Sequence, residues 1–454
     1  MHGKNDTKNL ELSHPTRAVR VPYRGDVRQA AITAKLYPAA HFYGYAILNS
    51  MNDADIVIIG AGLTGLRAAL EVTRAGLSVL VIEASADVGG RMRTTAQDGC
   101  LLDHGFQVLL SGYPEFTSLP PLASLDPKPF WSGARMRIAD EQVDLLDPRE
   151  QPLSILRALR SSAVSTTDLF RLARFMGITS GRALRTEGRS TADAIDRAGF
   201  SELFKTAFLR PFLRGVLLDP TLTTDAGLAR FYLRIFTFGG AVLPVRGIQA
   251  FPNLLADTLG RQHIVLNAPV AHIRKDRVVL QSGEEIFAGK VICAVDSMSA
   301  AALGGPEQTA PHFGTATVYF LAERPPYREP LLTLSGDGRG PINNLAIPSN
   351  VQASYAPDGQ ALIAASVLGD DARRNEADLV SQCRAQLHGW FGPDVAQWRH
   401  IRTFHLPHAL PARPRFSQGY TVKDDILFAG DYLSYGSQNG ALAAGRAAAL
   451  EVLL

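Results

Sequence analysis

The segment Asp55-Ile-Val-Ile-Ile-Gly60-Ala-Gly62-Leu-Thr-Gly65 decides the fold of this chain. Its first half is a short, β-branched apolar run, which is typical of a parallel strand buried on both faces. Apolar residues then recur at helical spacing from Leu66 to Val72, and Ser78-Val-Leu-Val-Ile82 indicates a second strand. The pattern therefore predicts a β-α-β unit at the start of an α/β protein.

The three glycines of this segment predict a dinucleotide site. Gly60 permits a tight turn, Gly62 lets a pyrophosphate approach the backbone, and Gly65 allows close packing of helix and strand. The helix N-terminus offers free N–H groups and a partial positive charge to the phosphates. Glu83, at the tip of the second strand, can accept hydrogen bonds from a ribose diol. A plain βα turn whose glycines serve packing alone is the alternative, and this unit does not distinguish nicotinamide from flavin.

Two further motifs favour flavin. Gly89-Gly90-Arg91 follows Glu83 and adds an arginine that can pair with phosphate oxygens, an appendage that a nicotinamide site does not need. Near the C-terminus, the strand 426–430 leads into Asp431 and a second glycine-opened helix, predicted over 440–454. An acid after a strand end and such a helix can hold a polyol chain and a polar ring edge.

With these motifs in this order, the span 51–454 resembles the FAD-dependent flavin amine oxidase superfamily, which includes amine oxidases, protoporphyrinogen oxidases and carotenoid desaturases. The resemblance implies that Glu83 binds the adenosine ribose, that Arg91 lies by the pyrophosphate and that Asp431 holds the ribityl chain. It also implies that the helix at 439–441 faces the isoalloxazine, that the backbone of Val270 meets the adenine and that the segment 102–107 passes close to the ring. The cofactor-binding residues predicted in this way are Gly60, Ala61, Gly62, Thr64, Gly65, Glu83, Ala84, Gly90, Arg91, Gly105, Val270, Gly430, Asp431, Asn439 and Ala441.

The resemblance further implies the fold class, an α/β protein with a Rossmann-type FAD-binding domain (GR2-like) and an inserted α+β substrate domain. We expect the FAD-binding domain to be discontinuous, over 51–108, 246–304 and 411–454, with the substrate domain over 109–245 and 305–410. Residues 1–50 show no sustained periodicity and are expected outside the fold. They are a non-native extension before Met51, a disordered tail or an Arg-rich targeting segment.

Composition limits the possible partners. The 46 basic and 43 acidic residues give a net charge of +3, and residues 1–50 carry more than all of this excess, so no nucleic-acid surface is expected. No apolar run approaches the ~18–20 residues of a membrane-spanning helix, although peripheral membrane contact stays open. The three cysteines form no C-x-x-C pair, which favours a reducing, cytoplasmic location and predicts neither disulfide nor metal site. The sequence does not indicate an oligomeric state.

Departures from the family pattern bear on the reaction. Amine oxidases of this type usually place a lysine near the flavin, but the strand that matches here, 314–320, has none. They also flank the substrate amine with two aromatic rings, whereas the matching positions here are Ser437 and the stretch 405–411. No cysteine occurs in 400–454, so FAD is predicted to bind non-covalently.

Other segments resemble the desaturase-like branch of the superfamily. Arg210-Pro-Phe212, with Phe200 and Phe204 before it, and the turn 243–247 carry this likeness. The aromatic residues of this region pack a helical core or line an apolar substrate tunnel, and both interpretations stay open. They include Phe231, Tyr232, Phe236 and Phe238.

We therefore predict an FAD-dependent oxidoreductase that removes hydride from a small, apolar substrate in the manner of desaturases and dehydrogenases, with oxygen or a quinone as acceptor. The alternative is a flavin-containing amine oxidase that releases hydrogen peroxide, and a third hypothesis is a non-catalytic FAD protein. The catalytic side chains stay unassigned, with His104 the histidine to examine for a position facing the flavin.

Overall fold

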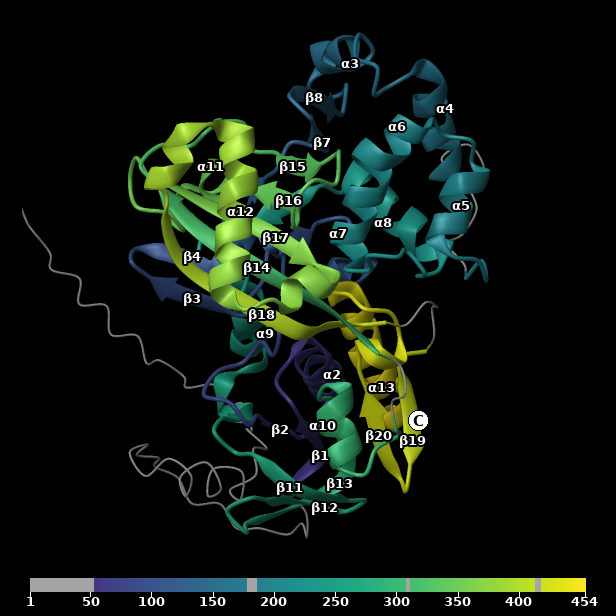
Figure 1. Cartoon of the computed structure of the whole chain (residues 1–454). Coiled ribbons are helices and arrows are strands. Elements are labelled where there is room, and N and C mark those ends of the chain that lie inside the picture. The colour runs from purple at the N-terminus through teal and green to yellow at the C-terminus, as the bar shows by residue number, and fades with distance from the viewer. Residues whose placement is uncertain (1–52, 178–185, 308–310, 413–417) are drawn as a thin grey trace, which may run out of the picture.

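The computed structural model describes residues 53–177, 186–307, 311–412 and 418–454. The predicted extension over 1–50 therefore lies outside the described residues. Figure 1 shows a sheet region at the bottom of the view, a second sheet region above it, and a group of helices, α3 to α8, beside the second sheet.

The lower sheet contains the predicted β-α-β unit. Its strands β10, β2, β1, β13 and β20 are parallel neighbours in this order, and β19 pairs antiparallel with β20. The first half of β13 also forms an antiparallel ladder with β12, which pairs with β11. Segments distant in sequence thus meet in one sheet. The strands are β1 (Ala54–Ile59), β2 (Val79–Ile82), β10 (Ile264–Val265), β11 (Val270–Arg274), β12 (Arg277–Leu280), β13 (Glu285–Cys293), β19 (Tyr420–Lys423) and β20 (Ile426–Ala429).

Two helices from opposite ends of the described chain lie side by side on this sheet. They are α2 (Leu63–Arg74), purple in Figure 1, and α13 (Gln438–Leu453), yellow. A Cβ at Gly445 would lie 2.2 Å from the backbone oxygen of Thr64, so the two backbones approach closely because residue 445 is a glycine. The predicted helix 440–454 begins two residues earlier, since the Ser437 hydroxyl caps it by accepting from the Gly440 N–H at 2.8 Å. The region also contains α9 (Ala250–Leu259) and α10 (Ser297–Ala302).

The upper sheet has seven strands in the order β18-β14-β17-β16-β15-β7-β8, antiparallel except for the pair β15 and β7. Helix α12 (Glu376–Phe391) packs on one face, where alternate residues of β14 and β17 form an apolar core with it. The opposite face turns toward the rest of the molecule. The strands are β7 (Gly133–Ile138), β8 (Glu141–Leu146), β14 (His312–Ala322), β15 (Leu332–Ser335), β16 (Ile342–Ala346), β17 (Ala361–Leu368) and β18 (Arg399–Pro411).

The described residues between 150 and 238 are largely helical. Its helices are α3 (Pro152–Ala158), α4 (Thr166–Phe175), α5 (Thr191–Arg197), α6 (Glu202–Phe204), a π-helical turn η3 (Lys205–Leu209), α7 (Arg210–Leu217) and α8 (Ala226–Phe238). Short ladders connect the regions, and among the described helices none is both long and apolar enough to cross a bilayer. These ladders contain β3 (Thr94–Gln97), β4 (Cys100–Asp103), β5 (Leu109–Leu110), β6 (Lys128–Pro129) and β9 (Ala241–Leu243).

The strands of the lower sheet come from 54–82, 264–293 and 420–429, and those of the upper sheet from 133–146 and 312–411. The finer boundaries of the two proposed domains stay a prediction.

Candidate active site

A single large cavity of about 1150 Å³ runs between the two sheets and the helical group. Gly62 of the first motif and Asp431 of the last both line it, although 369 positions separate them in the chain. From this polar end the cavity continues to apolar side chains of α4, α7 and α8. The described residues thus form one space with two chemically different ends.

The glycine-rich turn forms the polar end, and its three glycines are required for different reasons. Gly60 has a φ of +99°, and a Cβ there would lie 2.8 Å from the Ala294 oxygen. A Cβ at Gly65 would lie 1.9 Å from the Gly60 oxygen, so only glycine permits this packing. A Cβ at Gly62 would meet no protein atom within 4 Å, which leaves open space directly above the N-terminus of α2.

Glu83 organises the turn from the end of β2. Its Oε2 accepts from the Ala61 N–H at 2.7 Å, and its Oε1 accepts from the backbone N–H and hydroxyl of Ser85. Ala61 therefore uses its N–H for the carboxylate and does not itself line the cavity, whereas Glu83 does. The carboxylate is oriented by these donors and keeps acceptor capacity toward the cavity.

Arg91 joins the early motif to the late one. Its Nη2 donates to Asp431 Oδ1 at 2.6 Å, and its Nη1 donates to the Ala409 carbonyl oxygen at 2.8 Å. Asp431 is buried at the start of the turn after β20. This ion pair closes one wall of the cavity, and sequence reasoning assigned the two side chains to different parts of a cofactor without predicting their contact.

The N-terminus of α13 is held by α2 and by the turn η1 (Pro114–Ser118). The Thr64 hydroxyl donates to the Ala441 carbonyl oxygen at 3.0 Å, and both residues line the cavity. Asn439 is buried, and its side chain accepts from the Glu115 N–H at 3.1 Å and donates to the Tyr435 hydroxyl. Asn439 does not line the cavity; its side chain fixes the helix start instead.

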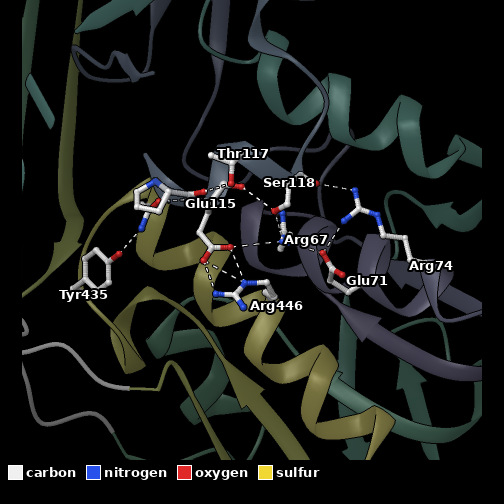
Figure 2. A network of polar contacts seen from close by, with 10 residues as sticks. Arg67, Glu71, Arg74, Glu115, Thr117, Ser118, Tyr435 and Arg446 are labelled. Carbon is white, nitrogen blue, oxygen red and sulfur yellow. Dashed lines mark hydrogen bonds and ion pairs between the residues drawn. The ribbon is translucent and has the colours of Figure 1, made fainter. Parts of the chain in front are cut away.

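A network of charged side chains joins α2, α13 and the turn η1, as Figure 2 shows. Glu115 accepts three hydrogen bonds from Arg446 of α13, at 2.7, 2.9 and 3.3 Å, and lies 3.6 Å from Nη2 of Arg67 on α2. Arg67 also pairs with Glu71 at 2.9 Å and donates to the Ser118 hydroxyl. Burial lowers the pKa of the Arg67 guanidinium, and the two carboxylates act against that shift. The network clamps the two helices that carry the predicted motifs.

The segment after β4 lies at the middle of the cavity. Gly105 adopts a φ of +81° and lines it, as do its neighbours His104 and Gln107. The ring of His104 stacks on Phe404, and its Nε2 lies 2.8 Å from the Thr95 hydroxyl. Burial lowers the pKa of His104, so the neutral ring is favoured.

Asp103, just before this segment, is fully enclosed. Its carboxylate accepts from the Thr94 hydroxyl at 2.6 Å, the Tyr355 hydroxyl at 2.8 Å and the Ile248 N–H at 3.0 Å. Burial raises the pKa of Asp103 to about 6, although these donors act in the opposite direction. The predicted segment 102–107 includes Asp103, but its hydrogen-bond partners were not predicted, because Tyr355 and Ile248 come from distant parts of the chain.

The far end of the cavity is an apolar chamber. Phe208, Phe212 and Phe236 line it, and they continue a row of ring contacts that begins in the core at Phe200 and Phe204. The four aromatic residues of 231–238 differ in position: Tyr232 and Phe236 line the cavity, Phe231 is buried in the core, and Phe238 is exposed and fits neither interpretation. Other walls of the chamber are Phe106, Phe130, Leu169, Leu172, Met176, Leu233, Leu332 and Leu334.

Most of the predicted cofactor-binding residues line the one cavity. Ala61, Gly65 and Asn439 are the exceptions, and each instead supports a lining neighbour. Within the described ranges no lysine or cysteine lines the cavity, and no cluster of His, Cys, Asp or Glu has the geometry of a metal site. The lining residues are Gly60, Gly62, Thr64, Glu83, Ala84, Gly90, Arg91, Gly105, Val270, Gly430, Asp431 and Ala441.

The polar end fits a dinucleotide. Helix α2 begins at Gly62 with no side-chain cap, so its first N–H groups face the open space above that glycine. Arg93 lines the same end, and its buried Nε has no partner among the described residues. An anion would satisfy both features, as an acid such as Glu83 would satisfy a ribose hydroxyl.

Comparisons with known proteins agree with this geometry. The family model described as flavin containing amine oxidoreductase matches residues 63–453. A 4,4'-diapolycopene oxygenase from Methylomonas sp. is 26 % identical over 197 residues, which are 40 % of this chain and 36 % of that protein. A hydroxysqualene dehydroxylase from Rhodopseudomonas palustris is 51 % identical over 57 residues, 12 % of this chain and 14 % of that protein. The alignments thus span about a third of the first relative's length, and less of the second's.

Among solved structures, a cyclohexylamine oxidase from Brevibacterium oxydans superposes with a TM-score of 0.66 at 18 % identity, covering 88 % of this chain and 98 % of that one. The structural match confirms the predicted fold class, and the family match confirms the resemblance read from the motifs.

Proposed function

The chain belongs to the flavin-containing amine oxidoreductase family, and we propose on that basis that it binds one FAD non-covalently and oxidises an apolar substrate by removing hydride. Molecular oxygen or a quinone is the proposed acceptor. The observation that carries the proposal is the single cavity, whose polar end suits a dinucleotide and whose other end is an apolar chamber.

The residues of the polar end have separate tasks in this proposal. Gly62 and the N-terminus of α2 receive the pyrophosphate, Glu83 accepts from the adenosine ribose, and Asp431 accepts from the ribityl chain. The three cysteines are buried, and none lines the cavity within the described residues, which supports non-covalent binding. FAD, when bound, supplies the acceptor of the hydride.

The apolar chamber has the task of holding the substrate and excluding water. Its rings and aliphatic side chains favour a molecule with little charge, because the carboxylate of Asp147, which lines this part of the cavity, already pairs with Arg149 and is not free to compensate a buried ammonium group. Two relatives are named for 4,4'-diapolycopene and hydroxysqualene. We take an isoprenoid chain as the substrate class and an amine as the competing class.

We also propose that the protein contacts a membrane surface at α3 and α4. Leu153, Leu156 and Phe170 on these helices are each more than half exposed, while Ile155 and Leu169 of the same helices line the cavity. Exposed arginines lie on or directly after the same two helices, among them Arg157, Arg160 and Arg174. Apolar residues flanked by basic ones suit an anionic lipid surface, from which an apolar substrate would enter the chamber.

The first experiment identifies the cofactor and the substrate class. The purified protein is unfolded, the released cofactor is separated by chromatography, and free FAD is expected. The holoprotein is then mixed without oxygen with hydroxysqualene, with 4,4'-diapolycopene and with a panel of amines. We expect loss of the oxidised flavin absorbance with an isoprenoid and none with amines.

Three results would contradict the proposal in different ways. A protein that retains no flavin, even after FAD is added, overturns the cofactor assignment. Bleaching by amines alone, with hydrogen peroxide released in air, assigns an amine oxidase. Flavin that stays oxidised with every compound and reacts only with dithionite assigns a non-catalytic role.

A further inference from the structure

Two polar side chains in the apolar chamber have hydrogen-bonding groups that no other described residue satisfies. They are Asn344 on β16 and Ser366 on β17, which are direct partners in the ladder between these strands. Both are more than nine-tenths buried, with exposed fractions of 5 % and 6 %, and both line the cavity.

The alternation of side chains along β17 directs Ser366 toward the chamber. Its neighbours Ala365 and Val367 belong to the core under α12, on the opposite face of the sheet. Residues of β16 alternate in the same way, with Leu345 in that core and Asn344 on the chamber side. The polar pair therefore belongs to the wall of the cavity.

A count of the available donors and acceptors shows what is left over. Asn344 Oδ1 accepts from Asn343 Nδ2 at 2.9 Å, which leaves the Nδ2 group of Asn344 as an unused donor. The Ser366 hydroxyl makes no hydrogen bond with any described residue. Buried polar groups are almost always paired, so an unpaired pair of neighbours requires an explanation.

Neighbouring hydroxyl groups on the same sheet are already paired within the protein. Thr315 Oγ1 donates to the Val367 carbonyl oxygen at 2.9 Å, and Thr317 Oγ1 accepts from the Phe106 N–H at 3.2 Å. Helix α7 also leaves room for the amide, because a Cβ at Gly215 would lie 2.9 Å from Asn344 Oδ1. Asn344 and Ser366 thus differ from these two threonines, whose hydroxyl groups are bonded within the protein.

We propose that Asn344 and Ser366 form a subsite for one oxygen function, a hydroxyl or a carbonyl, on an otherwise apolar substrate. The amide donates to the substrate oxygen, and the serine hydroxyl donates to a carbonyl or accepts from a hydroxyl. The inference rests on the proposed function and refines it: the substrate is an oxygen-bearing isoprenoid, not a pure hydrocarbon.

The test uses three probes of equal chain length: geranylgeraniol, its aldehyde, and the hydrocarbon that lacks the oxygen. Binding to the holoprotein is followed by tryptophan fluorescence, because Trp131 lines the cavity. We expect at least one oxygenated probe to bind about tenfold more tightly than the hydrocarbon, or better. The reason is that a hydrocarbon leaves the polar groups of Asn344 and Ser366 without a hydrogen-bond partner.

Variants locate the preference. Asn344→Leu and Ser366→Ala should each reduce it, and the double variant should abolish it while binding the hydrocarbon at least as well as the wild type does. Thr315→Val is the matched control, because Thr315 lines the same cavity with a hydroxyl that is already bonded. Should Asn344→Leu fold poorly, the smaller change Ser366→Ala still tests the pair, and retained flavin reports the fold.

Equal binding of all three probes to the wild type would overturn the subsite, as would a preference that survives in the double variant. These results are separable from failure of the proposed function. A flavin reduced by hydrocarbons without any oxygen preference removes the subsite alone. An oxygen preference in a protein whose flavin is never reduced keeps the subsite and removes the reaction.

Discussion

The polar and apolar ends of the cavity are built in opposite ways. The polar end consists mainly of backbone: the turn 60–65, the start of α2 and the start of α13, held in place by Glu83 and by the pair of Arg91 and Asp431. The apolar end consists of side chains from β8, α4, α7, α8 and β15, with no single segment dominating.

This difference predicts unequal tolerance to change. A backbone site fails when one Cβ cannot fit, whereas a wall of many side chains absorbs a single substitution at a cost set by volume. Cofactor binding should therefore be sensitive to single residues, and substrate preference should change gradually.

The largest expected effect comes from a matched pair of glycines at the polar end. Gly65→Ala places a Cβ 1.9 Å from the Gly60 oxygen, so the turn must distort, and we expect a loss of about 4 kcal/mol or more in the free energy of unfolding. Gly62→Ala meets no protein atom and should change that free energy by less than about 0.5 kcal/mol. Denaturant titration of the flavin-free proteins measures both.

The same pair separates folding from cofactor binding. The Gly62→Ala protein should fold and yet lose its flavin, because the new methyl group occupies the space proposed for the pyrophosphate. Retention of flavin at wild-type affinity by Gly62→Ala would show that the cofactor lies elsewhere.

Asp103, between the two ends, should make stability depend on pH. Its pKa is raised to about 6 in the folded protein, so the folded state holds the proton more tightly than the unfolded chain does. The resulting stabilisation is complete below about pH 4 and is lost as the pH rises through about 6. At 1.36 kcal/mol per pKa unit, the loss is about 3 kcal/mol.

The comparison of wild type with Asp103→Asn isolates this contribution, since the variant has no proton to lose there. The difference between their unfolding free energies should change by about 3 kcal/mol between pH 3 and pH 8. Tyr355→Phe removes a donor to the carboxylate and should extend the change to higher pH. Parallel stability curves for wild type and Asp103→Asn would refute the assignment.

The charged network behind the polar end (Figure 2) should contribute less. Glu115→Gln keeps the shape of the side chain but removes the carboxylate that pairs with Arg446 and faces the buried Arg67. We expect a loss of about 2 kcal/mol, less than for a wholly buried pair because Glu71 still compensates Arg67. Flavin affinity should fall with it, since α2 and α13 both depend on this contact.

Glu285→Gln is the matched control for that loss. Glu285 pairs with Arg277 at 3.1 Å, but the side chains are 44 % and 30 % exposed, against 9 % and 1 % for Glu115 and Arg67, so its removal should cost less than about 0.5 kcal/mol. Equal losses in the free energy of unfolding for Glu115→Gln and Glu285→Gln would mean that the burial of Arg67 does not raise the cost of losing its carboxylate partner.

Sequence reasoning succeeded best where the chemistry lies in contiguous backbone. The strand at 55–59, the turn at 60–65 and Glu83 are local patterns, and the structure places Gly62, Glu83 and Asp431 on one cavity. The sequence predicted the start of α13 two residues too late. Ser437 caps the helix through its side chain, but the neighbouring glycines favoured a start at residue 440.

The residues that line the apolar end, and the contacts between distant segments, could not be derived from the sequence in this way. Phe208 lines the chamber and Phe204 does not, although both belong to one run of helical residues. The pairing of Asn344 with Ser366 depends on strand register, and the contact of Arg91 with Asp431 depends on how distant segments fold together. Such features follow from tertiary packing, which local pattern does not specify.

The smallest expected effect is at the outer surface of the apolar end. A Leu153→Ser and Phe170→Ser double variant should weaken binding to vesicles of mixed phosphatidylglycerol and phosphatidylcholine by about fivefold, or ~1 kcal/mol, because only part of each side chain would enter the lipid. Val422→Ser is the control: Val422 is 51 % exposed on β19, at the opposite end of the view in Figure 1. Sedimentation with vesicles at low and high salt measures the binding, and the arginine contribution should fall with salt. An equal loss of vesicle binding in Val422→Ser, or no vesicle binding by the wild type, would contradict a lipid contact at α3 and α4. The substrate would then have to enter the cavity from water.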